Sequence, residues 1–361
     1  MDRYITLIKA LGIFAVVNGH LKAGNLGHIY YLFHIPLFFF LTGYLYKDKY
    51  SENPLLMVKQ RLKTLYLPFI LYGFSFLLLR EFFIKIGFYS IDTSVQDSIS
   101  PLIGIDQYMS TIKSILTLQY YEPLLLTFWF LVVLFEVSIL FAFVRFISEM
   151  FFKKQPKEAT FFIITILFLI GFRLTKSGVI LPVQLDKALI CLFFVNLGYI
   201  YQFCKEKILF KTNYAILAIL ALTVLERFGY VNIDLRKYTD PPYFVLGALL
   251  GIYVVFWIAS LLSKYNNLWT RLLEIIGNNT LPIVALHIFA FKVVTYIRIK
   301  LHILDQSVLS NVFPQAQGIG WKLIYISAGL ILPVLIGILI KKVTQLITKN
   351  EPQIGLKYNK V

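Results

Sequence analysis

The stretch LLLTFWFLVVLFEVSILFAFVRF, residues 124–146, indicates the fold most clearly. Glu136 and Arg145 are its only charged residues, and as a helix it is long enough to cross the ~30 Å hydrocarbon core of a bilayer. Its apolar residues run continuously instead of alternating, which argues against a strand of a β-barrel. Lipid offers no hydrogen-bond partner to backbone groups, so a spanning segment of this kind is predicted to be an α-helix.

The rest of the chain is similarly apolar. Of its 361 residues, 58% are hydrophobic and 15% are charged, whereas a soluble domain has about 45–50% apolar and about 25% charged residues. The sequence therefore predicts an all-α integral membrane protein, a single domain over residues 1–361 that forms one bundle of about ten transmembrane helices. The candidate spans lie at about residues 4–21, 28–46, 64–84, 124–146, 159–174, 186–203, 213–228, 243–263, 281–297 and 321–341.

The basic residues predict how these spans cross the bilayer. A net charge of +16 would indicate nucleic-acid binding in a soluble protein, but here the partner we expect is the lipid bilayer and no nucleic acid. If the N-terminus lies inside, most Lys and Arg fall in cytoplasmic segments, notably residues 47–63 and 341–361. We therefore expect a multi-pass protein of the cell membrane, in bacteria the cytoplasmic membrane, with both termini cytoplasmic.

Few features outside the spans predict a further function. The connection of residues 85–123 is expected to be external, and residues 102–118 within it have the apolar spacing of a helix on the membrane surface. Cys191 and Cys204 indicate neither a disulfide framework nor a zinc site, and no metal is predicted. The N-terminus has no signal-cleavage pattern and is expected to stay as the first span.

Two histidines lie in the first two predicted spans. His20 ends the run LGIFAVVNGHL, and His34 lies in FHIPLFFFLTGYLY. An ionisable residue inside a span indicates function. The alternative, a histidine that only packs between helices, is almost as common. The two spans form a tight hairpin, which places both histidines at similar depth. The pair Thr42-Gly43 allows another helix to approach closely.

Arg61 and Lys63 lie at the cytoplasmic start of the third span, in VKQRLKTLYLP. Anchoring by the positive-inside rule explains both residues, and their spacing alone favours this reading. The alternative is a phosphate clamp, because arginine offers a planar fork and lysine a point charge to a polyanionic ligand.

These elements together resemble the acyltransferase-3 family of integral-membrane O-acyltransferases, in particular its fucose 4-O-acetylase-like branch. Lys9 and His20 have the family's eleven-residue spacing between a basic residue and a histidine. HIYYLFHIPLFFFLTGYLY, KQRLKTLYLPF, FWFLVVLF and IGNNTLPIVALH are similar to four further family segments and follow the family's order. Two departures are that Lys9 replaces a common arginine and that Glu136 lies seven residues after Trp129 instead of five.

The resemblance implies an acyltransferase. The donor would be cytosolic acetyl-CoA or another acyl-CoA, and the acceptor a hydroxyl of a cell-surface or lipid-linked sugar or polysaccharide. A sugar hydroxyl needs a base, and a neutral imidazole with a pKa near ~6.5 is suitable. Transfer could be direct or proceed through an acyl-enzyme. The alternative is a membrane transporter of saccharides, although no duplicated halves are visible in the sequence.

The resemblance also assigns residues to the site. His20 is expected to be the general base, with His34 beside it as a second catalytic group. Trp129 would line the path of the acceptor, although a tryptophan at the end of a span more often anchors the helix at the membrane interface. Glu136 would orient a histidine or bind a cation. The remaining assignments are Arg61, Lys63 and Lys9 for the donor phosphates, Asn279 for substrate, and His287 for the donor path or for packing.

Overall fold

The computed structural model describes residues 2–21, 25–89, 91, 98–314 and 316–349, so Lys357 and Lys360 of the C-terminal basic cluster lie outside the described residues. The protein is 78% helical, and its described residues contain no β-strand. In chain order the elements are α1 (Arg3–Gly19), α2 (Asn25–Tyr44), α3 (Lys49–Glu52), α4 (Pro54–Arg61), η1 (Leu62–Tyr66), α5 (Leu67–Lys85), α6 (Ile105–Leu116), η2 (Pro123–Phe128), α7 (Trp129–Phe151), α8 (Pro156–Lys176), η3 (Pro182–Gln184), α9 (Leu185–Cys204), η4 (Lys205–Lys207), α10 (Thr212–Leu225), α11 (Pro241–Leu262), α12 (Leu268–Asn278), α13 (Thr280–Lys300), η5 (Gln306–Ser310) and α14 (Ile319–Lys349).

Each segment predicted to span the membrane coincides with a helix. Seven helical segments among the described residues are long and apolar enough to cross a bilayer: Pro54–Lys85, Pro123–Phe151, Pro156–Lys176, Pro182–Cys204, Pro241–Leu262, Thr280–Lys300 and Ile319–Lys342. By contrast, α1 has 17 residues and α10 has 14, fewer than the ~20 that a crossing needs. The all-helical fold is confirmed, whereas the count of about ten spans stays a prediction.

Proline marks the start of several helices. Pro54, Pro156 and Pro241 lie in the first turns of α4, α8 and α11, where a backbone N–H has no partner inside the helix. Asp240 then caps α11, because its carboxylate accepts a hydrogen bond from the backbone N–H of Tyr243 at 2.8 Å. The local sequence thus sets where these helices begin.

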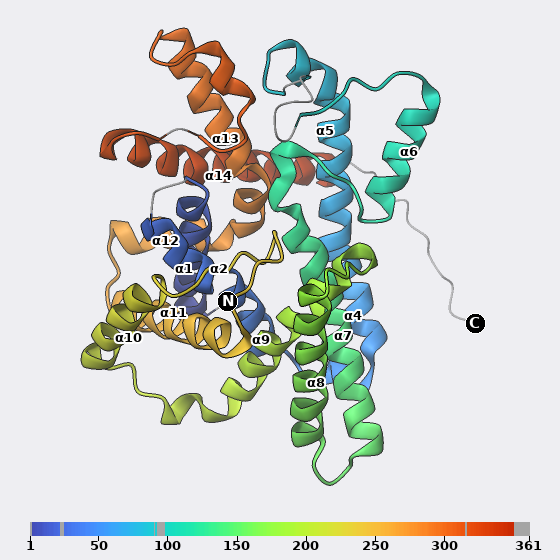
Figure 1. Ribbon diagram of the computed structural model, residues 1–361, viewed down its shortest axis with the longest axis vertical. Coiled ribbons are helices and arrows are strands. Elements are labelled where there is room, and N and C mark those ends of the chain that lie inside the picture. Colours follow the sequence, from blue (N-terminus) through green and yellow to red (C-terminus); the bar gives the residue numbers. More distant parts are fainter. Residues whose placement is uncertain (1, 22–24, 90, 92–97, 315, 350–361) are drawn as a thin grey trace.

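Helix α9 packs against α2, α7 and α8 and lies between the two sides of the molecule in Figure 1. Its closest approach is to α2. A Cβ atom built on Gly43 of α2 would lie 1.8 Å from the carbonyl oxygen of Val195, and one on Gly198 of α9 would lie 1.8 Å from that of Phe40. The close approach predicted at Gly43 is therefore present, with glycine on both helices.

We expect Gly198→Ala to destabilise the fold by about 1–3 kcal/mol, the usual range for overpacking, because the new methyl group would meet rigid backbone. Thermal unfolding of the purified protein in detergent, followed by tryptophan fluorescence, measures this loss. The matched control is Gly320→Ala in α14, where an added Cβ meets nothing within 4 Å. Equal unfolding temperatures for the two variants would contradict the tight crossing of α2 and α9.

Helix α6 lies at the edge of the molecule beside α5 in Figure 1. Ile105 and Met109 are 76% and 57% exposed, while the Tyr66 hydroxyl donates to the carbonyl oxygen of Leu116 at 2.9 Å. The exposed apolar face agrees with the amphipathic helix expected within residues 102–118. Its place on the membrane surface stays a prediction.

Candidate active site

A cavity of about 620 Å³ lies between the ends of α1 and α9, helix α2, the η2–α7 junction and the connection that precedes α11. It is named the His20 cavity here. His20 and His34 both line it, together with Tyr31, Trp129 and Phe313. The two histidines expected to be catalytic therefore face the same space.

His20 is hydrogen-bonded to His287 of α13. Nδ1 of His287 lies 2.8 Å from the carbonyl oxygen of Ile283, and Nε2 of His287 lies 3.2 Å from Nδ1 of His20. Nδ1 of His20 is also 2.9 Å from the carbonyl oxygen of Val16. A carbonyl oxygen can only accept a hydrogen bond, so in each neutral imidazole Nδ1 carries the proton.

These contacts determine which nitrogen of His20 is basic. In the neutral pair, Nε2 of His287 accepts from the Nδ1–H group of His20, which leaves the lone pair of His20 on Nε2. Phe313 stacks on the His20 ring with centroids 5.6 Å apart and planes at 2°, and Tyr31 meets the ring edge-on at 6.4 Å. These contacts thus fix the orientation of the His20 ring.

His34 has a similar arrangement. Its Nδ1 is hydrogen-bonded to the carbonyl oxygen of Tyr30, and the residue is only 3% exposed. The Tyr31 ring lies 5.2 Å from the His34 ring and so contacts both imidazoles of the cavity. His287, by contrast, is completely buried and lies outside the cavity lining, as the direct partner of His20. The role predicted for His287, in the donor path or in packing, stays a prediction.

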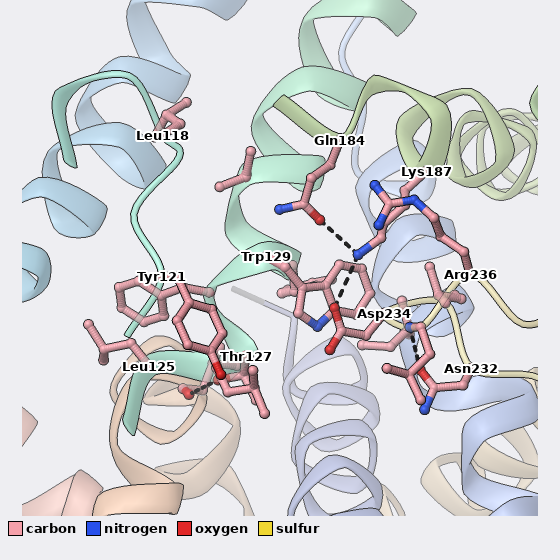
Figure 2. A pocket seen from close by; sticks show the side chains of 18 of the residues that line it. Leu118, Tyr121, Leu125, Thr127, Trp129, Gln184, Lys187, Asn232, Asp234 and Arg236 are labelled. Atoms are coloured by element: carbon pink, nitrogen blue, oxygen red, sulfur yellow. Dashed lines mark hydrogen bonds and ion pairs between the residues drawn. The ribbon is translucent and has the colours of Figure 1, made fainter. Parts of the chain in front are cut away.

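A wall of polar side chains surrounds Trp129 elsewhere in the cavity, as Figure 2 shows. Nζ of Lys187 lies 3.1 Å from Oδ1 of Asp234 and 2.8 Å from Oε1 of Gln184. The same ammonium group lies 4.6 Å from the centre of the Trp129 ring, a cation–π contact. Trp129 therefore lines the His20 cavity, and its role in the path of the acceptor stays a prediction.

A second ion pair completes this wall. Arg236 binds Asp186 in a bidentate manner, with Nε 2.7 Å from Oδ2 and Nη2 3.2 Å from Oδ1. Asp186 is fully buried and belongs to α9, whereas Arg236 belongs to the connection between α10 and α11. Because Lys187 and Arg236 are each paired with a carboxylate, the four charges of the wall cancel.

Left-handed backbone conformations gather at this cavity. Leu118, Val183, Gln184 and Arg236 have φ angles of 60°, 53°, 67° and 55°, and all four line it. Among the described residues the only other non-glycine residue with positive φ is His302. Such conformations cost on the order of 1–3 kcal/mol each and tend to occur at ligand sites.

Glu122 anchors the long connection between α5 and α7 to the cavity, and it is only 2% exposed. Its carboxylate accepts hydrogen bonds from the hydroxyls of Tyr89 and of Tyr120, the latter at 2.9 Å. Burial raises the pKa of this carboxyl group. The hydroxyl donors hold Glu122 in place, so it shapes the wall of the cavity.

A second cavity, of about 440 Å³, lies next to the first and is named the basic cavity. Lys9 and Arg61 line it, and Nε of Arg61 is buried with no hydrogen-bond partner among the described residues. Phe38, Phe130 and Val284 line both cavities. These shared side chains therefore lie between the basic cavity, lined by Lys9 and Arg61, and the His20 cavity.

A π-helical turn, η1, directly follows Arg61. Pro68 has no N–H group to donate to the carbonyl of Thr64, which removes one α-helical hydrogen bond at this point. Turns of this type are frequent at functional sites. Lys63 lies within the turn, but it is exposed and belongs to the lining of neither cavity.

Glu136 and Asn279 also lie outside both linings. Oε2 of Glu136 is buried with no hydrogen-bond partner among the described residues. The described residues also include no group of three or more metal-ligating side chains. The Asn279 amide joins α12 to α14, because Nδ2 donates to the carbonyl oxygen of Ile275 at 2.8 Å and Oδ1 accepts from Nζ of Lys341 at 3.1 Å. The roles expected for Glu136 and Asn279 in substrate binding stay predictions.

Comparison with known families shows what kind of protein contains these cavities. The pattern of a family described as an acyltransferase domain matches residues 2–346. The chain belongs to the acyltransferase-3 family. Neither the curated proteins nor the solved structures gave a significant match. Membership favours an enzyme over a transporter, and the matched range contains every residue that lines the two cavities of this acyltransferase.

Most of the charged residues in the polar wall of the His20 cavity were not predicted from the sequence. Asp186 and Lys187 begin a predicted span, and two consecutive charged residues at that position were the available signal. Asp234 and Arg236 come from the connection between α10 and α11, and nothing in their spacing predicts ion pairs with α9.

Proposed function

We propose that this acyltransferase moves an acetyl group from cytosolic acetyl-CoA to a sugar hydroxyl at the outer face of the cell membrane. The observation that supports this most directly is the pair of adjacent cavities divided by Phe38, Phe130 and Val284. A polyanionic donor needs cations and a hydroxyl acceptor needs a base. With both termini in the cytoplasm, the basic cavity faces the donor's compartment, and the His20 cavity faces cell-surface or lipid-linked saccharides, the acceptors of a fucose 4-O-acetylase-like enzyme.

In the proposed reaction, Nε2 of His20 takes the proton of the acceptor hydroxyl while the hydroxyl oxygen attacks the thioester carbonyl. The new C–O bond forms, the C–S bond breaks, and the proton passes to the sulfur, which gives an acetyl ester and free coenzyme A. Nε2 of His287 and the Val16 carbonyl both accept from Nδ1–H of His20, and they stabilise the transient imidazolium. His20 has the same role whether the acetyl group moves directly or through an acyl-enzyme.

Arg61 and Lys9 are the proposed donor-binding residues. The buried, unpartnered Nε of Arg61 fits a phosphate oxygen, because an unmatched buried donor gains most from a charged acceptor. The acetyl end of the donor would then pass the layer of Phe38, Phe130 and Val284 to reach His20.

We expect Arg61→Ala to weaken acetyl-CoA binding about tenfold to a hundredfold, the range for a lost charge-assisted hydrogen bond. Titration of the purified protein with acetyl-CoA measures the affinity. Lys63→Ala is the matched control, because Lys63 is exposed and outside the lining of the basic cavity. Unchanged affinity in Arg61→Ala would reduce Arg61 to an anchor at the membrane surface.

The function itself is tested on the cell surface. Mass spectrometry of surface glycans should show acetyl groups on one sugar per repeat that disappear when the gene is deleted. They should return with the intact gene and not with a His20→Ala copy. Identical glycans with and without the gene would contradict the proposal. Accessibility labelling of single cysteines near each cavity tests the orientation.

A further inference from the structure

A third hollow, of about 340 Å³, adjoins the His20 cavity and is named the outer hollow. Arg236, whose place in the wall of the His20 cavity is seen in Figure 2, lines both spaces, so they meet at this side chain. Lys176 from the end of α8 and Lys237 from the connection before α11 also line the outer hollow. Hydroxyl-bearing side chains complete its polar lining, from Thr175, Tyr230, Tyr238 and Thr239.

The two adjoining spaces differ in charge. In the wall of the His20 cavity, Lys187 and Arg236 are neutralised by carboxylates. None of the described residues that line the outer hollow is acidic. Arg236 uses Nε and Nη2 for its ion pair with Asp186, so the exposed Lys176 and Lys237 supply the net positive charge of the outer hollow.

The backbone that carries these lysines is fixed next to the cavity. Asn232 and Lys237 exchange two backbone hydrogen bonds, of 2.8 and 3.0 Å, across an isolated antiparallel bridge. The neighbouring Tyr238 packs on Phe172 of α8, with ring centroids 5.1 Å apart. This contact links the connection to the helix that ends at Lys176. The backbone of both lysines is therefore held in a defined position beside one hollow.

Anchoring in the membrane does not account for this cluster. In the proposed orientation the outer hollow lies on the external side, where the positive-inside rule predicts few Lys and Arg. Phosphate recognition does account for it, because lysine and arginine are the usual partners of phosphate groups. A cationic hollow that continues a cavity of balanced charge fits a molecule with an uncharged part and an anionic part.

We propose that the outer hollow is a second acceptor subsite, which binds an anionic group of the phosphate class carried next to the sugar that receives the acetyl group. The inference rests on the proposed function. The uncharged sugar ring occupies the His20 cavity beside Trp129, and the phosphate lies against Lys176 and Lys237. The acceptor is then a sugar linked to a phosphate, as in a lipid-linked or phosphodiester-linked saccharide, and a free neutral sugar is a poor substitute.

The test measures binding without turnover. The purified acyltransferase, in a polyoxyethylene detergent that contains no sugar, is titrated calorimetrically with a panel of hexose 1-phosphates and with the same free hexoses. We expect at least one hexose 1-phosphate to bind about tenfold or more tightly than its free hexose, and added salt to reduce the difference. Inorganic phosphate should compete with it.

Paired variants locate this preference. Lys176→Gln combined with Lys237→Gln should abolish the preference for the phosphorylated sugar. Lys85→Gln combined with Lys113→Gln changes the net charge equally at exposed lysines outside the outer hollow and should keep it. No preference in the unmodified protein, or a preference that survives in the Lys176/Lys237 variant, would overturn the proposal.

Anionic phospholipid headgroups present the same phosphate chemistry, so a second arm uses vesicles. If the outer hollow holds headgroups, the protein should float with phosphatidylglycerol vesicles in preference to phosphatidylcholine vesicles, and this preference should depend on Lys176 and Lys237. Hexose 1-phosphates should then bind no more tightly than the free hexoses. That result overturns the acceptor subsite. Acetyl-CoA affinity, measured on the same samples, tests the proposed function separately. Intact donor binding with no sugar-phosphate preference refutes the subsite alone, whereas failure to bind acetyl-CoA refutes the function.

Discussion

His20→Ala is expected to slow acetyl transfer about 10²–10⁴-fold, the usual contribution of a general base. The alanine side chain has no nitrogen to take the proton from the acceptor hydroxyl. His34 lines the same cavity, but its Nδ1 is hydrogen-bonded to the carbonyl oxygen of Tyr30 and not to a second imidazole. Donor binding should be unchanged, because Lys9 and Arg61 line the basic cavity and His20 does not.

The measurement is acetyl transfer by membranes that contain each variant at equal protein level, with acetyl-CoA affinity determined in parallel. His28→Ala serves as the control, since His28 is half exposed and lines neither cavity. Transfer by His20→Ala at the wild-type rate would show that another group removes the proton.

His287 provides an internal check on this assignment. If it acts only by orienting His20, then His287→Phe added to His20→Ala should lower the rate no further, because groups that act as a unit are not additive. Alone, His287→Phe should alter the pH dependence of transfer more than the affinity for acetyl-CoA. The Val16 carbonyl, 2.9 Å from Nδ1 of His20, should preserve part of the activity.

The membrane-length helices were predictable because each contains a nearly continuous apolar sequence, and several begin at a proline. The number of membrane crossings was harder to predict, because helix length and not hydropathy decides it. Residues 213–228 have the composition of a span, yet α10 ends at Leu225 after 14 residues. Beyond that point Asn232 and Lys237 form a bridge that sequence periodicity does not reveal.

The candidate site was predictable only in part. His20 and His34 stood out because an imidazole is rare within apolar sequence, and both line the predicted site. The partner of His20 is His287, 267 positions away, and no local pattern encodes a contact at that separation. The same holds for Arg236 and Asp186, which only the packing of the connection before α11 on α9 brings together.

Asp186→Ala is expected to destabilise the protein by up to about 3–5 kcal/mol, the range for removing one partner of a buried ion pair. Asp186 is fully buried, and its carboxylate accepts from Nε and Nη2 of Arg236 and from the backbone N–H of Leu181 at 3.2 Å. The Arg236 side chain is 22% exposed and can turn partly toward water, which favours the lower end of the range. Thermal unfolding in detergent measures the loss.

The double variant Asp186→Asn with Arg236→Gln separates stability from function. It removes both charges together, so no buried charge is left unpaired, and much of the lost stability should return. The wall of the His20 cavity should nonetheless remain altered, because Arg236 holds a left-handed backbone conformation beside that cavity through its bond to α9. We therefore expect a raised KM for the acceptor and an unchanged affinity for acetyl-CoA in the double variant. If it binds acceptor normally, the ion pair serves stability alone and the acceptor's contacts lie nearer to Trp129 and Lys187.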